Sequence, residues 1–399
     1  MRSVRTSGIV ETSQQYRKGV LAALDGTGWP PELEQAALAA VQRLARARKA
    51  TFTPQLGHAV VAAARTIAFT VVPLMASVYL WTNGWRFAVV PLLILAGLGL
   101  YGGVAILHDL AHSTFLPSRN ANAIAGHMLA PLLLMEFSGF RQSHLGHHKH
   151  TQSISDPKRF GVEHREETRH PDHSSLELFP VPVQVLLRMG AKLTLLPLRL
   201  RHFIYVFIMP MVMGPAVLLF SGEFSVARRD WRQSETWTSS LASAVMLALL
   251  YIYSPLLLVF FFVALLIGHA FTFNVFASHM SPHQVYWTSD RRAGMADALN
   301  VSDIHCGRLV AWLGHGLSDY HSLHHLSPAI PCYHLPEAEA LVAPDLAPLR
   351  APAIDLLNPA SCAVLFDGLI SGGVHKNSVA WDYAAAGGMR RVATPETDA

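Results

Sequence analysis

Four long hydrophobic stretches dominate the pattern along the chain, and they are arranged in two pairs. The first pair covers residues 58–81 and 85–107, and the second covers residues 237–253 and 256–277. A helix rises about 1.5 Å per residue, so stretches of this length can cross a hydrocarbon core of about 30 Å. Because only two or three residues join the members of each pair, the pattern predicts two helical hairpins that span a membrane.

The rest of the chain is polar or mixed, and its pattern predicts three regions. Residues 1–57 are expected to form a cytosolic segment, with an amphipathic helix that begins near Pro31. Residues 58–335 are expected to form the membrane domain, and residues 336–399 a cytosolic tail. Residues 176–220 could hold a further span, but their Arg and Lys residues favour helices that lie in the membrane interface.

The basic residues predict the orientation. Of the 31 Lys and Arg residues, all but Arg65 and Arg86 fall outside the four spans and the short links within each pair. Loops rich in Lys and Arg remain on the cytoplasmic side of a membrane. An even number of spans then places both termini, and the long segment between the hairpins, in the cytoplasm.

The composition supports a membrane protein and argues against nucleic-acid binding, a disulfide framework and a thiolate metal site. Hydrophobic residues make up 51% of the chain and charged residues 15%, whereas soluble domains carry about 25% charged residues. The net charge of +4 is modest, and no basic run with interleaved aromatic residues suggests nucleic-acid binding. Cys306, Cys332 and Cys362 have no paired spacing, which argues against a disulfide framework and against a thiolate metal site.

The 22 histidines are the clearest anomaly, and eight of them form three short motifs. The first motif is H-x-x-x-H, and the other two are H-x-x-H-H. The eight residues are His108, His112, His144, His147, His148, His321, His324 and His325. Residues three and four apart lie on one face of a helix, so each motif directs two or three imidazoles toward one point. All three motifs fall on the predicted cytoplasmic side, and together they predict one metal centre.

Eight imidazoles are too many for one ion, which takes about four to six ligands, and they therefore predict a two-metal site. Imidazole suits zinc, copper, iron and nickel alike, so the ligands alone do not select the metal. A metal-binding histidine usually donates its other N–H group to a carboxylate or a carbonyl. Asp109, Asp156 and Asp319 lie within or near the motifs and are candidates for this role. The alternative is that they are ordinary helix caps or surface charges.

The other histidines are weaker candidates. His279 follows the fourth span, where the end of a helix could reach the centre, and His283 is a competing choice on the same face. His127 and His269 lie in apolar stretches, where we expect core residues. Seven further histidines lie in a charged loop or near the third motif: His150, His164, His170, His173, His305, His315 and His334.

Three passages resemble the membrane-bound fatty acid desaturase and hydroxylase family. They are HDLAHSTFLPSR (108–119), RQSHLGHHKHT (141–151) followed by Asp156-Pro157, and YHSLHHLSPAIP (320–331). The order and spacing of the motifs and the paired hairpins agree with that family over residues 108–335. Pattern and resemblance together predict an all-α integral membrane protein with four transmembrane helices in two hairpins. A helical cytosolic cap would then carry the histidine motifs.

The resemblance implies a non-haem centre of two iron ions that activates O₂ with two external electrons. A ninth histidine ligand at the end of the last span is typical of the family, and His279 matches that position. The implied reaction is desaturation of an acyl chain carried by a lipid or a thioester. Hydroxylation or carotenoid-type oxygenation is the alternative, because these reactions use the same ligands. We expect a separate electron donor of ferredoxin or cytochrome b5 type, since the chain has neither paired haem histidines near its N-terminus nor a four-cysteine cluster.

Two other classes of protein would place their histidines or other ionisable residues elsewhere in the sequence. A histidine-rich metal transporter would place ionisable groups along a pathway at mid-membrane, but the spans offer little besides Arg65 and His269. A haem electron carrier would place single histidines on facing spans, whereas the histidines here cluster near the ends of spans. The sequence therefore favours a catalytic metal centre at the membrane surface.

Overall fold

Helices dominate the computed structural model. It describes residues 18, 22, 28–50, 52–152, 156, 197–212, 234–279, 284, 294–346, 349–362, 381–384 and 388–391. The long helices are α2 (Pro31–Ala50), α3 (Leu56–Thr82), α4 (Val89–His112), α10 (Ser234–Tyr253) and α11 (Pro255–Ala277). The shorter α-helices are α5 (Arg119–Leu129), α6 (Phe137–His150), α8 (Leu198–Phe203), α12 (Arg308–Leu313), α13 (His321–Leu326) and α14 (Leu335–Leu346). Short 3₁₀ turns are η1 (Arg86–Ala88), η2 (Ala130–Leu133), η7 (Ala296–Leu299) and η8 (Cys332–His334), and η5 (Ile204–Ile208) is a π-helical turn.

Strands contribute very little. The pair β1 (Ile304–His305) and β2 (Ile354–Asp355) is parallel, and the pair β3 (Trp381–Ala384) and β4 (Gly388–Arg391) is antiparallel. The predicted all-α class is confirmed.

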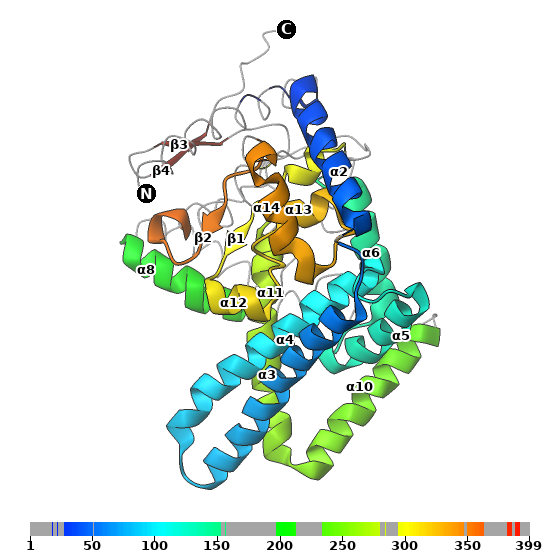
Figure 1. The fold of residues 1–399 in the computed structure, drawn as a ribbon. Coiled ribbons are helices and arrows are strands. Elements are labelled where there is room, and N and C mark those ends of the chain that lie inside the picture. Colours follow the sequence, from blue (N-terminus) through cyan, green and yellow to red (C-terminus); the bar gives the residue numbers. More distant parts are fainter. Residues whose placement is uncertain are drawn as a thin grey trace, which may run out of the picture.

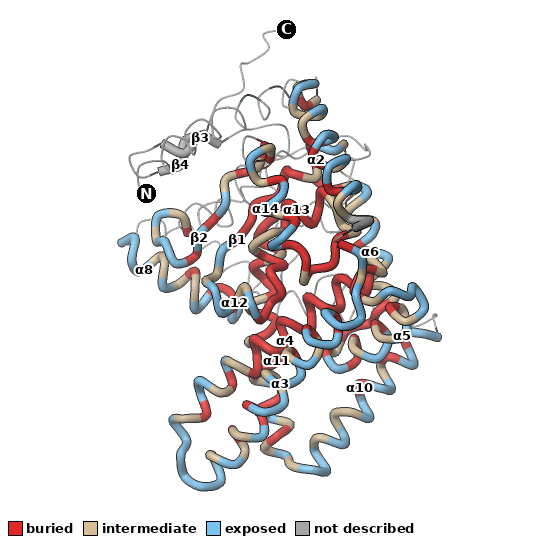
Figure 2. Tube along the Cα trace, in the orientation of Figure 1, coloured by how far each residue is buried: buried red, intermediate tan, exposed pale blue. Residues whose placement is uncertain are grey.

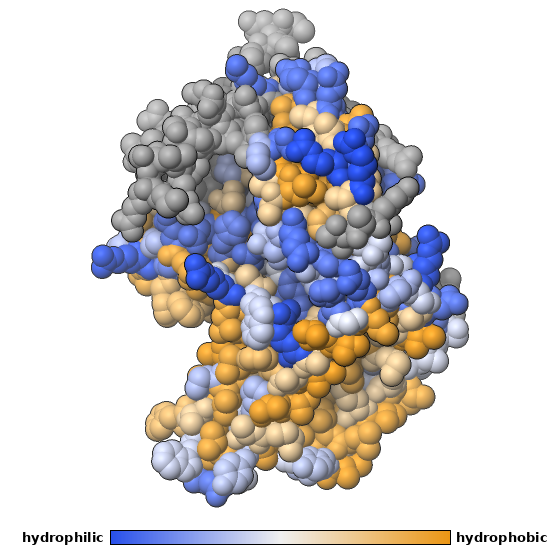
Figure 3. All heavy atoms as spheres, in the orientation of Figure 1, coloured by the Kyte–Doolittle hydropathy of each residue, from blue (hydrophilic) through white to orange (hydrophobic). Residues whose placement is uncertain are grey.

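Four helices among the described residues are long and apolar enough to cross a membrane. They cover Leu56–Thr82, Arg86–His112, Ser234–Tyr253 and Pro255–Ala277, which confirms the four predicted spans. The helices form two hairpins that lie together, and hydrophobic side chains cover most of this part of the molecule (Figures 1 and 3). The bent pair Arg119–Leu133 and Phe137–His150 turns by 106°. The region beyond the upper ends of the spans, which contains α6 and α13, is called the cap below (Figure 1).

The two hairpins meet closely where α4 crosses α11. A Cβ atom added to Gly97 would lie 2.5 Å from the Ile267 side chain and 2.9 Å from the Ala264 carbonyl oxygen. A Cβ atom on Gly268 would lie 2.9 Å from the Gly97 carbonyl oxygen. Small residues let membrane helices approach each other in this way. The crossing fixes the relative positions of the upper ends of α4 and α11.

The most deeply buried part of the chain lies above this crossing, where α4 and α11 run into the cap (Figure 2). Every residue of α4 from Ala96 to Ala111 is buried, and so is most of α11 from Leu265 to Ala277. By contrast, α3 and α10 expose large apolar side chains such as Val61, Val72, Leu241 and Leu249. The inner two spans therefore form the core, and the outer two face lipid.

The N-terminal helix α2 begins at Pro31, as predicted, and packs on the cap. Just before the helix begins, the indole N–H group of Trp29 donates to Asp297 at 2.7 Å. In the second half of the helix, Arg43 forms an ion pair of 2.7 Å with Asp345. Helix α14 and strand β2 also pack on the cap. The boundary predicted between residues 335 and 336 therefore runs through the start of α14.

Two short segments lie at the level where the spans meet the cap (Figure 1). Of the predicted interfacial region 176–220, the structure describes residues 197–212, which form α8, η5 and one further turn; the remainder of 176–220 lies outside the described residues. This segment exposes apolar side chains, among them Phe203 and Phe207. In α12, Leu309 and Trp312 are about half exposed, and Trp312 packs edge-on against Phe69 of α3.

Candidate metal centre

The first two histidine motifs come from helices that end beside each other. His108 and His112 occupy the last two turns of α4, and His144, His147 and His148 occupy the second half of α6. Helix α6 begins where the Glu136 carboxylate accepts the N–H groups of Ser138 and Gly139. The spacing of three and four residues directs these side chains to common faces, as the sequence predicts.

The third motif and the single predicted histidine approach from the other side. Helix α13 carries His321, His324 and His325, all fully or almost fully buried. His279 lies two residues after α11, where its N–H group closes a last turn on the Phe276 carbonyl at 3.0 Å. The ring nitrogens Nε2 of His279 and His321 lie 2.8 Å apart. The structure therefore brings all nine predicted histidines together; His283 lies outside the described residues.

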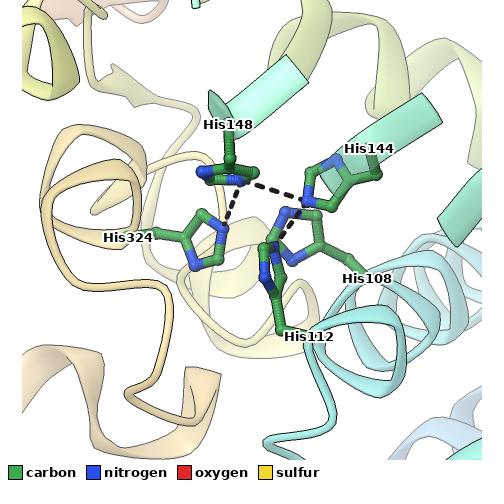
Figure 4. A group of neighbouring side chains, drawn as sticks. All are labelled: His108, His112, His144, His148 and His324. Carbon is green, nitrogen blue, oxygen red and sulfur yellow. Dashed lines mark hydrogen bonds between the residues drawn. The ribbon is translucent and has the colours of Figure 1, made fainter. Parts of the chain in front are cut away.

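The nine histidines divide into two adjoining groups. The first consists of His108, His112, His144, His148 and His324, whose candidate ligand atoms all lie within 4.8 Å of one another (Figure 4). The second consists of His147, His279 and His325, with His321 beside it. The groups are in contact, because the rings of His148 and His325 stack with centroids 4.1 Å apart.

The contacts inside the first group fit a shared cation better than shared protons. The Nε2 atom of His144 lies 2.7 Å from Nε2 of His112 and 3.1 Å from Nε2 of His148, and the latter lies 3.2 Å from Nε2 of His324 (Figure 4). A neutral ring nitrogen is either a donor or an acceptor, so this chain of four cannot be satisfied by hydrogen bonds alone. Imidazoles bind metals at about 2.0–2.1 Å, which places neighbouring ligand nitrogens about 3 Å apart.

In the second group, the two ring nitrogens of His147 have different surroundings. Its Nδ1 lies 2.8 Å from Oδ1 and 2.9 Å from Oδ2 of the buried Asp156 carboxylate. Its Nε2 is buried and has no hydrogen-bond partner among the residues that the structure describes. A histidine whose Nδ1–H group donates to a carboxylate and whose Nε2 is directed into a cluster of imidazoles is oriented as a metal ligand.

Burial and neighbouring imidazoles favour the neutral form of three of these rings. Burial, together with neighbouring imidazoles, holds the pKa values of His148, His324 and His325 well below the usual 6.5. Metal binding requires a neutral imidazole with a free lone pair. These three histidines therefore supply their nitrogens in the form that binds a cation.

Comparisons with known proteins agree with this geometry. The family model for fatty acid desaturases matches residues 83–356, which include all nine histidines and more than half of the chain. The chain belongs to the fatty acid desaturase family.

Individual relatives are distant. A protein of Sorghum bicolor named a probable fatty acid desaturase is 28% identical over 257 residues, covering 60% of this chain and 59% of its own length. The sn-1 oleoyl-lipid 12-desaturase of Anabaena variabilis is 32% identical over 78 residues, covering 18% of this chain and 22% of its own length. The chain thus spans less than two thirds of the length of these relatives.

Three carboxylates were predicted to orient histidine ligands, namely Asp109, Asp156 and Asp319, and they have different neighbours in this desaturase-family chain. Asp156 contacts His147. Asp109 accepts the Cys332 N–H group at 2.6 Å, and its Oδ1 lies 3.6 Å from Nδ1 of His108, which is too long for a hydrogen bond. Asp319 lies 3.0 Å from Nδ1 of His305, which is not part of either group.

Among the described residues, the other histidines lie outside the two groups. His315 contacts Arg65 and Thr66 of α3, and His334 contacts Glu337. His269 is buried within α11, as expected of a core residue. The same expectation is wrong for His127, which packs edge-on against Phe137 but is exposed on α5. His164, His170 and His173 lie outside the described residues.

Two polar residues support the centre and have no motif of their own. Gln152 has a positive φ of 60°, and its side-chain amide donates to the His279 carbonyl at 3.2 Å, while its N–H group donates to Asp156 at 2.8 Å. Asp303 accepts two hydrogen bonds from Ser322 on α13. The Gln152–His279 contact joins residues 127 positions apart and the Asp303–Ser322 contact residues 19 positions apart, so motif spacing could not indicate them.

A mostly apolar cavity adjoins the histidines. His108, His144, His279 and His321 form its polar side. The other lining residues, from α4, α6, α11 and the segment before α13, are Val104, Phe140, Thr272, Val275, Phe276 and Leu317. A cavity of this composition suits an apolar ligand beside a metal.

Proposed function

We propose that the chain is a membrane fatty acyl desaturase that dehydrogenates an unactivated C–C bond in an acyl chain, with O₂ and two external electrons. One observation supports this above all others: nine imidazoles lie in two adjoining groups beside an apolar cavity. Family membership is consistent with the acyl substrate. The two groups would hold one iron ion each, and all nine histidines would be ligands.

Bound iron would supply the oxidising chemistry, namely removal of hydrogen from a C–H bond. The protein residues do the rest. Val275 and Phe276 would hold the acyl chain against His279, and Phe140, whose ring stacks on His144, would help to exclude water. Asp156 would hold a proton on Nδ1 of His147 and so keep Nε2 available.

The substrate would be an acyl lipid or an acyl-thioester, and the electrons would come from a separate ferredoxin or cytochrome b5 type donor. We further propose that the centre and both termini face the cytoplasm. The distribution of Lys and Arg residues supports that orientation.

Mass spectrometry of lipids and acyl-thioesters from expressing cells tests the proposal. Cells with the intact chain should gain new double bonds, and the His147→Ala variant should lose both the product and iron. His150→Ala is the matched control, because His150 lies on the same helix outside both groups and its loss should leave the product unchanged. New hydroxyl groups in place of double bonds would instead identify a hydroxylase with the same centre.

Metal analysis of purified protein is the second test. We expect two iron ions per chain and no haem absorption band. A content well below two, or a haem band, would contradict the proposal whatever the lipid analysis shows.

A further inference from the structure

Helix α13 is too short to hold its own orientation. It has six residues, and three of them are histidines of the centre. Isolated helices shorter than about 12 residues are marginal in water, so packing and side-chain contacts must fix this one. Its first turn is held from outside: the Asp303 carboxylate accepts the Ser322 N–H group through Oδ1 and the Ser322 hydroxyl through Oδ2, both at 2.8 Å.

We propose that Asp303 is a positioning residue of the metal centre, which fixes the direction in which α13 presents His321, His324 and His325. This inference rests on the proposed function. Ser322 lies between His321 and His324, so a carboxylate that binds both of its polar groups limits rotation of the helix about its axis and tilting at its N-terminal end. Those are the two motions that would withdraw the imidazole nitrogens from the centre.

The main chain around Asp303 is itself held on both sides. Its carbonyl accepts the Ile354 N–H group at 2.8 Å, where β1 meets β2. The next N–H group, of Ile304, donates to the Ser318 carbonyl at 2.9 Å. The carboxylate therefore projects from a fixed backbone, and its two bonds transmit that position to α13.

The charge of the Asp303 carboxylate faces that of Arg350. Asp303 is only 6% exposed, and Nη1 of Arg350 lies 3.8 Å from Oδ2 of Asp303. Arg350 is in turn held by two bonds to Glu339, at 2.6 and 2.7 Å. A buried carboxylate persists when it is paired and hydrogen-bonded in this way. Burial raises the pKa of Asp303, and the nearby Arg350 charge counters this shift. Glu339 on α14 in turn holds Arg350 in place.

Asp319 is nearer to the third motif in sequence, but it does not have this role. Its carboxylate contacts His305 and the Ser318 hydroxyl. The residue that holds α13 lies 19 positions before Ser322 in the chain. Contact through space, and not proximity in sequence, identifies the positioning carboxylate.

The test compares three full-length variants purified with their iron: Asp303→Asn, Ser322→Ala and the control Ser302→Ala. Asp303→Asn keeps the shape but replaces one acceptor oxygen with a donor that opposes Ser322. Ser322→Ala removes only the hydroxyl bond and keeps the N–H bond. Ser302 is buried beside Asp303, and its hydroxyl has no hydrogen-bond partner among the described residues, so Ser302→Ala removes a neighbouring hydroxyl without touching α13.

The readouts are the rate at which iron is lost to a chelator and the Mössbauer spectrum of the iron that remains. Loss of an orienting partner typically weakens a metal site by about 10–100-fold. We expect iron loss at least about tenfold faster for Asp303→Asn, a smaller increase for Ser322→Ala and the wild-type rate for Ser302→Ala. A changed spectrum of the retained iron should accompany the faster loss, with an unchanged gel-filtration profile and helical circular dichroism.

Two outcomes would overturn the inference. One is wild-type iron retention in Asp303→Asn; the other is iron loss that occurs only together with aggregation or lost helicity, which would make Asp303 a general folding residue. Wild-type protein that binds no iron would overturn the proposed function, and the inference with it. That failure is distinguishable because it is seen in the wild type before any variant is compared.

Discussion

His147 and Asp156 form a buried pair in which Nδ1 lies within 2.9 Å of both carboxylate oxygens. The same carboxylate accepts the Gln152 N–H group, and Gln152 in turn supports the carbonyl of His279. One aspartate therefore orients one candidate ligand directly and a second through a neighbour. This relationship links the second motif to the end of the fourth span.

Replacing Asp156 with Asn should weaken the second group of histidines. The amide carries no charge and can present a donor to His147, so the imidazole loses the partner that keeps its proton on Nδ1. We expect iron affinity to fall by about 10–100-fold, measured by competition with a chelator. Asp345→Asn is the control, since it breaks an exposed ion pair with Arg43 and should not change iron binding. Equal affinities in the two variants would contradict the orienting role.

The α4–α11 crossing should not tolerate an added methyl group. Gly97→Ala would force Ile267 and the Ala264 carbonyl to move, and overpacking of this kind costs roughly 1–3 kcal/mol. We expect a lower melting temperature in detergent. Gly57→Ala is the matched control, because a Cβ atom there has no neighbour within 4 Å and the melting temperature should not fall. A Gly97→Ala variant as stable as the Gly57→Ala variant would show that the crossing can relax.

His315 should make the protein sensitive to acid. Burial, and then the nearby Arg65 charge, lower the pKa of His315 to about 3, while an unfolded histidine titrates near 6.5. Between those values the unfolded chain binds more protons, so the contribution of His315 to stability is complete above pH 6.5 and declines as the pH falls. His315→Asn removes the titrating ring and can adopt the positive φ of this position. The melting-temperature advantage of the wild type over this variant should shrink between about pH 7 and about pH 5; a constant difference would contradict the expectation.

Helix α12 should lie at the surface of the bilayer. Trp312 is about half exposed, the Arg65 guanidinium lies 4.6 Å from its ring centroid, and it packs against Phe69 within the first span. We expect brominated lipids to quench the fluorescence of Trp312. Quenching of the total tryptophan fluorescence should therefore be weaker in the Trp312→Phe variant than in the wild type. An aqueous quencher acting more strongly than the lipids on this residue would place α12 in the cytosol instead.

The four spans and the three histidine motifs could be predicted from the sequence, because both depend on local order. Hydrophobic length determines whether a helix can cross a membrane, and spacing of three or four residues determines which imidazoles share a helix face. The short links within each pair also predicted the two hairpins. These features do not depend on which distant segments come into contact.

Only the tertiary structure decided how the histidines are divided and which carboxylates support them. His147 and His148 are adjacent in sequence, yet they belong to different groups, because successive residues on a helix point about 100° apart and meet different partners. Among the hydrogen bonds of the described residues, those of Asp303 reach Ser322 of α13 and those of Asp319 reach His305 and Ser318, because β1 and β2 place Asp303 beside Ser322. Sequence spacing determines the direction of a side chain on its own helix, whereas packing between helices determines what that side chain meets.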